Sequence, residues 1–226
     1  MELEPRERIL RLASRATGDE KHEPSSHSTL DVLTVLYHRI LNVRPEQPDW
    51  DDRDRFILSK GHGCAAFYAV LCDRGFFPES WLNGFMVRGG RLGGHPDRLL
   101  VPGAEASTGS LGHGLPMAIG VGLALRAKGK STPRVVVLTG DAELNEGSNW
   151  EAILLAPHLQ LTNLTLVVVD NHSTTPPLVP LDGKLESFGW EMVVVGGRDH
   201  AALEQAFSRP RSDRPQAVVA KIEEGA

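Results

Sequence analysis

Several features are missing from this chain, and each absence narrows its class. No apolar stretch approaches the roughly 20 residues that a membrane helix needs. The N-terminal segment Met1–Arg8 is charged and has no apolar signal core, which predicts a cytoplasmic location. The net charge is -5 and no segment is rich in lysine and arginine, so we expect neither a nucleic-acid partner nor a membrane partner.

The chain is also poor in cysteine. Cys64 and Cys72 are the only two, and they lie eight residues apart in a segment that we expect to be helical. That spacing is too long along a helix axis for a redox pair. We expect two buried free thiols in a reducing compartment.

The amino acids that are present favour one α/β domain. A length of 226 residues allows a substantial single core, and 41% apolar with 23% charged residues is ordinary for a globular protein. Apolar runs rich in β-branched residues alternate with helical patterns, so we predict a single doubly wound, mostly parallel sheet with helices on both faces. We expect strands at 55–59, 134–139, 164–169, 188–195 and 217–221, and helices at 3–17, 29–41, 65–71, 112–128, 149–160 and 201–207.

Polar residues follow two of these strands directly. Asp141 comes after the 134–139 run, and Asn171 comes after the 164–169 run. Ligands of open α/β sheets bind at the carboxyl ends of the strands, where these side chains converge. Two oxygen ligands there suit Mg²⁺, which is usually held by few protein ligands together with substrate phosphates. Gly140 and Gly147 would let the backbone approach a diphosphate closely.

The Gly140 segment, together with Asn171, resembles the thiamine diphosphate motif. Four other segments extend a resemblance to one family over most of the chain. From about residue 8 to 222, the sequence looks like the N-terminal, diphosphate-binding half of a transketolase. The resemblance rests on motifs that occur in family order: His22 ahead of Asp31–Tyr37, Leu58–Gly63, Gly93–Asp97, Ser107–Leu115 and the Gly140 segment.

The resemblance implies a set of cofactor contacts. Asp141 and Asn171 are expected to bind Mg²⁺, with the Ser173 carbonyl as a third protein oxygen. The backbone around Ala142 and Glu143, after Gly140, would contact the diphosphate. The backbone of Ser110, Leu111 and Gly112 would face the aminopyrimidine or thiazolium ring of the cofactor, and Glu146 would lie near the cofactor and a subunit interface.

Three histidines are implied in catalysis. His22, His62 and His95 match family histidines that contact the substrate and move protons. An imidazole, with an ordinary pKa of about 6.5, suits that task near neutral pH. Each also has a simpler interpretation, as a solvated loop residue or, for His62, as a residue at a helix start. His113 stands where the family usually has glutamine, and we expect it only to keep a hydrogen bond.

Two departures from the family pattern bear on cofactor binding. Ala142 replaces the usual glycine, which would restrict the backbone if its φ had to be positive. The residues after Asn171 are His-Ser-Thr-Thr-Pro-Pro-Leu rather than a glycine-rich continuation.

The resemblance also implies a partner. In this family, a glutamate from a pyrimidine-binding domain completes the site, and 226 residues leave no room for that domain. We therefore expect residues 1–226 to be the diphosphate-binding domain of a split transketolase, in an α₂β₂ heterotetramer with a C-terminal subunit that carries the catalytic glutamate. The assembled enzyme would transfer a two-carbon ketol unit from a ketose, such as a sugar phosphate, to an acceptor.

Three alternatives remain open from the sequence. The first is a specialised biosynthetic system that delivers the two-carbon unit to a carrier protein or another unusual acceptor. The second is an enzyme like 1-deoxyxylulose-5-phosphate synthase, which would use pyruvate as its donor. The third is a non-catalytic binding or scaffold subunit, which would not bind thiamine diphosphate.

Overall fold

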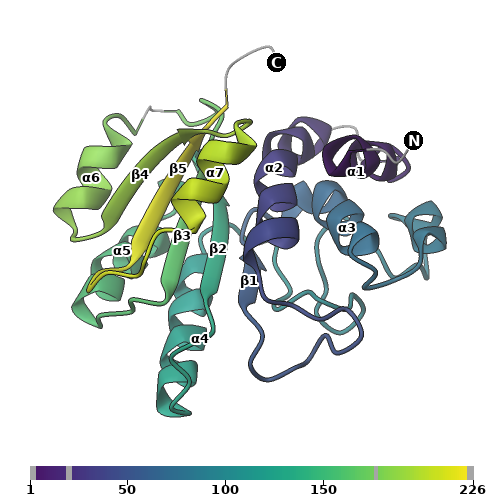
Figure 1. Cartoon of the computed structure of the whole chain (residues 1–226). Helices are drawn as coiled ribbons and strands as arrows, with labels where there is room; N and C mark the ends of the chain where they lie inside the picture. Colours follow the sequence, from purple (N-terminus) through teal and green to yellow (C-terminus); the bar gives the residue numbers. More distant parts are fainter. Residues whose placement is uncertain (1–3, 19–21, 176–177, 223–226) are drawn as a thin grey trace.

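The sheet at the centre of the molecule is entirely parallel. A computed structural model describes residues 4–18, 22–175 and 178–222, and within them five strands pair in the order β1-β2-β3-β5-β4 (Figure 1). Four of the five strands are built largely from buried aliphatic residues, as expected for a sheet covered on both faces. The strands are β1 (Arg55–Leu58), β2 (Val135–Gly140), β3 (Leu164–Asp170), β4 (Glu191–Gly196) and β5 (Gln216–Lys221).

Helices pack on both faces of the sheet, as the sequence predicts. Inward side chains alternate along each strand, so Val136 and Leu138 enter one apolar cluster while Val135 and Val137 enter the other. The first cluster lies under α1 (Pro5–Ala13), α2 (Glu23–Val35), α3 (Cys64–Asp73) and α7 (His200–Phe207). The second lies under α4 (Gly114–Ala127), α5 (Gly147–His158) and α6 (Leu181–Ser187).

The direction of the connections creates a topological switch point between β1 and β2. After β1 the chain enters α3 on the first face, whereas after β2 it enters α5 on the second face. The loops that leave these neighbouring strands therefore diverge. In open α/β sheets, ligands bind at such a switch point, outside the carboxyl ends of the strands.

Most of the predicted elements are confirmed, with two clear differences. The sequence prediction missed α6, and it began the fourth strand at residue 188, where the chain is still leaving α6. Trp190, just before β4, is fully buried and donates from its indole nitrogen to the Ile153 carbonyl at 2.8 Å. In addition, α2 begins six residues earlier than predicted and continues into a π-helical turn at Leu36–Ile40.

The N-terminal helix α1 is attached through both charged and apolar contacts. Arg6 donates to the buried carboxylate of Asp31 at 2.6 Å, and Arg8 pairs with the buried carboxylate of Asp73. Ile9 and Leu12 are buried in the apolar cluster on this face of the sheet. None of the helices in the described part of the chain combines the length and the apolarity needed to span a bilayer.

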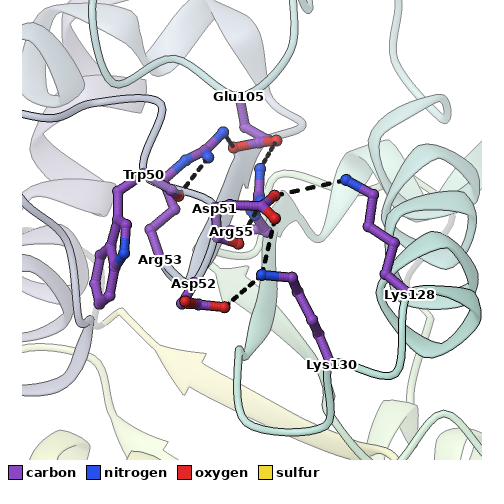
Figure 2. Close-up of polar contacts among 8 residues, drawn as sticks. All are labelled: Trp50, Asp51, Asp52, Arg53, Arg55, Glu105, Lys128 and Lys130. Atoms are coloured by element: carbon purple, nitrogen blue, oxygen red, sulfur yellow. Dashed lines mark hydrogen bonds and ion pairs between the residues drawn. The ribbon is translucent and has the colours of Figure 1, made fainter.

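A network of charged residues surrounds the amino end of β1 (Figure 2). Glu105 accepts from Arg53 at 2.8 Å and from Arg55 at 3.0 Å, and all three side chains are only 10–12% exposed. Lys130 pairs with Asp51 at 2.8 Å and with Asp52 at 2.5 Å. These contacts tie the loop before β1 to the connection that precedes α4 and to the turn after it.

Candidate functional site

Asp141 occupies the carboxyl end of β2, beside the switch point. Its backbone nitrogen donates to the Val169 carbonyl at 3.0 Å, which extends the pairing of β2 with β3. Its carboxylate is buried and accepts from the Ser173 amide at 2.7 Å, the Ser173 hydroxyl at 2.6 Å and the Thr174 amide at 3.2 Å. The segment after β3 is thereby folded back over β2, so predicted metal ligands 141 and 173 lie in direct contact.

Asn171 contributes an oxygen that has no partner in the described part of the chain. Its Oδ1 atom is buried and accepts no hydrogen bond from any described residue. Such an atom is costly unless something else satisfies it. The next residue, His172, has a φ of 59°, in the region usually taken by glycine or asparagine, and this turns the chain sharply after Asn171.

Lys60 is a component of the site that the sequence analysis did not select. It follows β1, is 3% exposed, and donates to the Ser28 hydroxyl at 3.3 Å. Its Nζ would lie 3.8 Å from a Cβ atom built on Gly140, which places the ammonium beside the end of β2. Burial lowers the pKa of Lys60 to about 8, against the opposing effect of Asp141 and Glu143.

Glu143 holds the loops of the site together. Its Oε1 atom accepts from the Ser59 hydroxyl and from the Gly112 amide, the latter at 3.0 Å, so it joins three segments. Burial raises the pKa of the Glu143 carboxyl, although these hydrogen bonds oppose the shift. The Oε2 atom is also buried and has no partner among the described residues. The prediction concerned the backbone of Glu143, whereas its side chain points into the protein.

The loop before α4 passes close to the loop before α5. Gly112 has a φ of +83°, and an added Cβ would lie 2.6 Å from the Glu146 Cβ, so the position requires glycine. Ser148 donates to the Gly112 carbonyl at 2.7 Å. Predicted contacts Ser110 and Glu146 are both exposed, and therefore accessible to a ligand or a partner.

The structure brings two of the three predicted catalytic histidines together. The rings of His22 and His62 lie 5.4 Å apart and line the same cavity. The ring of His95 lies against Gly109, and its carbonyl accepts from the Tyr68 hydroxyl at 2.9 Å. His95 is not among the described residues that line this cavity. The His62 loop and the His95 loop meet through Gly109, because Gly61 also packs against its backbone.

The first departure noted in the sequence, Ala142, is accommodated. Ala142 begins a short 3₁₀ helix, Ala142–Asn145, and is not among the described residues with positive φ. A methyl group at this position therefore introduces no backbone strain. Cys64 and Cys72 are free thiols, as predicted, but Cys72 is only partly buried.

The arrangement fits a bound cation and a phosphorylated cofactor. Two buried carboxyl groups, of Asp141 and Glu143, lie near one buried ammonium, that of Lys60. A divalent ion is one ligand that could satisfy the buried oxygen of Asn171. No cluster of three His, Cys, Asp or Glu occurs in the described part of the chain, which is compatible with a site built from one carboxylate, one amide and backbone oxygens.

Comparisons with known proteins agree with this geometry. The family described as "Transketolase, thiamine diphosphate binding domain" matches residues 6–224. The chain is 38% identical over 226 residues to one of the subunits of the apulose-4-phosphate transketolase of Actinobacillus succinogenes, covering 96% of this chain and 80% of that protein. It superposes on a crystal structure of a transketolase variant from Pichia stipitis with a TM-score of 0.83 and 26% identity, covering 96% of this chain and 36% of that one. The chain thus spans about a third of the length of that transketolase.

A third similarity carries an unrelated name. The chain is 48% identical over 212 residues to "Ferredoxin fas2" of Rhodococcoides fascians, covering 93% of this chain and 70% of that protein. An iron–sulfur cluster of the ferredoxin type needs four cysteine ligands. The 226 residues contain only two cysteines, so they cannot supply the ligands of such a cluster.

Proposed function

We propose, from the premise that the chain belongs to the transketolase family as its thiamine diphosphate binding domain, that it is the cofactor-binding subunit of a two-component transketolase. Three features of the strand ends support the proposal. Asp141 after β2 has a buried carboxylate, Asn171 after β3 has a buried oxygen without a partner among the described residues, and the buried ammonium of Lys60 lies beside Gly140.

Specific residues would hold the cofactor. Mg²⁺ would bind the side chains of Asp141 and Asn171 and the Ser173 carbonyl, and the diphosphate would complete its coordination. Lys60 would offset the added negative charge from the β1 side of the switch point. The remaining contacts would come from Ser110, Leu111, Gly112, Gly140, Ala142, Glu143 and Glu146.

The residues of this chain would then position substrate and move protons. Thiamine diphosphate, when bound, supplies the electron sink needed to break the bond next to a ketose carbonyl. In the overall reaction, the C2–C3 bond of the ketose breaks, the shortened aldehyde leaves, and the two-carbon unit joins the carbonyl carbon of an acceptor. His22 and His62, with His95, would take the proton from the donor hydroxyl and return one to the acceptor oxygen.

The proposed partner is a chain with a pyrimidine-binding domain and the catalytic glutamate, in an α₂β₂ assembly. Its docking surface would be the exposed side of α4 and α5. Met117 is 36% exposed, Leu154 60% and Leu155 43%, and both helices begin at the loops of the cofactor site. A partner seated there would therefore be continuous with the cofactor.

The proposed donor is a ketose, such as a sugar phosphate, and the proposed compartment is the cytoplasm, where Cys64 and Cys72 would stay reduced. Transfer to a carrier protein and a synthase-like use of pyruvate are competing reactions of the same site. A scaffold role is the non-catalytic alternative.

Reconstitution with the partner chain tests the proposal. The complex should bind thiamine diphosphate in a Mg²⁺-dependent manner by calorimetry, and it should transfer a two-carbon unit from a ketose. Absence of binding by the assembled complex would favour a scaffold, and cleavage of pyruvate instead of a ketose would favour the synthase-like reaction. Robust transfer by this chain alone would refute the two-component arrangement.

The docking surface has its own matched pair of variants. Leu155→Arg should prevent assembly, measured by sedimentation, because it places a charge in the apolar surface. Val194→Arg serves as a control, since Val194 is equally exposed at 43% but lies on β4, at the opposite edge of the sheet. If the two variants assemble equally well, the partner binds another surface.

A further inference from the structure

Arginines gather at the amino ends of the strands, at the opposite edge of the sheet from Asp141. One of them comes directly before β2, and the others lie in the connection from α7 to β5. All of them line one small pocket, and together they are called the arginine cluster: Arg134, Arg209, Arg211 and Arg214. The strands are parallel and β2 has six residues, so about 20 Å of strand separates this pocket from the cofactor site.

Backbone carbonyls, rather than carboxylates, hold two of these guanidinium groups in place. Arg134 donates to the Phe207 carbonyl at 2.7 Å. Arg211 donates to the Ser131 carbonyl at 2.5 Å and to the Thr132 carbonyl at 2.6 Å. A carbonyl fixes the position of a guanidinium group without neutralising its charge. Both groups also keep N–H donors that no described residue occupies, because a guanidinium has more donors than these contacts use.

The acidic residues of the pocket do not balance its positive charge. Glu191 is the only carboxylate among the described wall residues, and it lies 3.9 Å from Arg209, which is too far for a hydrogen bond. Arg214 makes its hydrogen bonds to described residues through its backbone, with Ser212. Asp213 lies in the same connection but does not line the pocket. Four cations thus share one acidic wall residue at a distance.

Two members of the cluster are close enough to repel each other. Partial burial, and then the charge of Arg134, lower the pKa of Arg211, and the carboxylate of Asp54 opposes the shift. That carboxylate already accepts from the backbone amide of Asn42 at 2.8 Å and from that of Arg134 at 2.6 Å. A bound anion would relieve the repulsion between the two guanidinium groups.

The size of the pocket limits what it can enclose. Its volume of about 20 Å³ has room for little more than one water-sized group. A ligand could therefore place only one small anionic group between the arginines and would leave its remainder in solvent. Guanidinium groups match the oxygens of a carboxylate or of a phosphate. A phosphate monoester carries close to two negative charges at neutral pH, and this suits several adjacent cations better than the single charge of a carboxylate.

We propose that the arginine cluster binds the phosphate group of a small phosphate monoester, at a site separate from the cofactor site. Arg211 and Arg214 would donate to the phosphate oxygens, and Arg134 would add its charge from the start of β2. Wall hydroxyls of Thr162 and Ser212 are further donors at the pocket. The site needs neither thiamine diphosphate nor turnover, so the inference does not depend on the proposed function.

Calorimetry with glycerol 2-phosphate tests the site. The titration uses the reconstituted complex at pH 8, where the probe is a dianion, with saturating thiamine diphosphate and Mg²⁺. Arg211→Gln and Arg214→Gln should each weaken binding roughly ten-fold, the scale of one charge-assisted hydrogen bond. Arg126→Gln is the matched control, because Arg126 also donates to a backbone carbonyl, that of Leu159 at 2.6 Å, and does not line the pocket.

The variants make the outcome decisive. Absence of saturable binding to the wild type would overturn the site, and so would equal affinity of the wild type, Arg211→Gln and Arg214→Gln. Melting curves check the fold, and Arg214→Gln should melt like the wild type because its side chain bonds to no described residue. Since the comparison is between variants, a complex that fails to bind the cofactor or to transfer a two-carbon unit would refute only the proposed function.

Two further probes test the class of ligand. Dimethyl phosphate has the same central group but a single charge, and it should bind at least ten-fold more weakly than glycerol 2-phosphate. Equal binding of the two would overturn the preference for a dianion. A peptide with one phosphoserine should bind no more tightly than glycerol 2-phosphate. Binding of the peptide more than ten-fold more tightly would overturn the small-molecule source and assign the phosphate to a protein segment.

Discussion

The two ends of β1 carry charged clusters of opposite character. At the amino end, Glu105 is shared by Arg53 and Arg55, so each buried charge has an opposite charge within 3.0 Å (Figure 2). At the carboxyl end, Asp141 and Glu143 share a single ammonium, that of Lys60. Buried oxygens of Glu143 and Asn171 there have no partner among the described residues. The charges of the first cluster are all paired within the protein. The second cluster leaves buried oxygens that a ligand would satisfy.

This contrast distinguishes a structural charge network from a binding site. Partnered buried charges resist removal of any one member, because removal leaves the others uncompensated. Buried oxygens without partners make the isolated fold less stable. The same oxygens favour binding of a cation that satisfies them. Substitutions at the two ends should therefore have opposite effects on stability and on cofactor binding.

The largest expected effect is on binding, at the carboxyl end. Asp141→Ala should weaken binding of thiamine diphosphate with Mg²⁺ more than about 100-fold, because loss of a metal ligand exceeds the 10–100-fold loss typical for residues that only support one. Calorimetry on the reconstituted complex measures it. Stability without cofactor should change little, since Ser173 is exposed and water can replace the lost acceptor. Unchanged Mg²⁺ dependence would contradict the assignment of this residue.

The reciprocal variant lies at the amino end. Glu105→Ala should lower the free energy of unfolding by about 3 kcal/mol, because it removes the close carboxylate partner of both Arg53 and Arg55 and leaves only a longer 3.7 Å pair between Arg55 and Asp51. Urea denaturation measures the loss, and cofactor affinity at a temperature where the variant is folded should match the wild type. A large drop in cofactor affinity with little change in stability would contradict the structural role of the amino-end network.

The third prediction concerns Lys60 and the effect of pH. Lys60→Met should weaken cofactor binding roughly ten-fold, the scale of one charge-assisted hydrogen bond. Between pH 8 and 10, the wild-type free energy of unfolding should gain up to about 1.4 kcal/mol per pH unit relative to the variant. The gain arises because the folded chain loses the Lys60 proton near pH 8, whereas the unfolded chain holds it to about pH 10.5.

Parallel denaturation curves at several pH values measure this difference. Lys130→Met is the matched control, because Lys130 pairs with Asp51 and Asp52 at the amino end and the Asp51 contact raises its pKa. Identical pH profiles of Lys60→Met and the wild type would show that the Lys60 ammonium is not perturbed by burial.

The smallest effect is expected at the exposed part of the amino-end network. Asp51→Asn should leave cofactor binding unchanged and should shift the urea midpoint only slightly, because the Asp51 side chain is 57% exposed and exposed ion pairs contribute little. The shift should vanish in high salt, since screening removes the attraction. A salt-resistant shift as large as that of Glu105→Ala would show that the network acts as one unit.

The strands were predictable because they depend on local sequence. Runs such as Val135–Gly140 identify buried parallel strands by composition alone, and Asp141 and Asn171 follow two of them directly. Helix α6 was missed because it is short and buries only Leu181 and Leu185, which is too little periodicity to recognise. The boundary error at residue 188 follows from the same omission.

Lys60 could not be predicted from its sequence position. A lysine is nearly always exposed, and only the fold shows that Ser28 and Gly140 enclose this one. The pairing of His22 with His62 likewise depends on how α2 and α3 pack against each other. Such contacts join distant segments and leave no periodic signature.

The attachment of α1 has a consequence for how this protein diverges from its relatives. The helix forms part of the wall of the cavity beside His22, and two arginine–aspartate pairs and its buried apolar residues fasten it. None of these contacts involves Asp141 or Asn171. Substitutions along α1 can therefore change the space beside His22 while the residues at the strand ends stay the same.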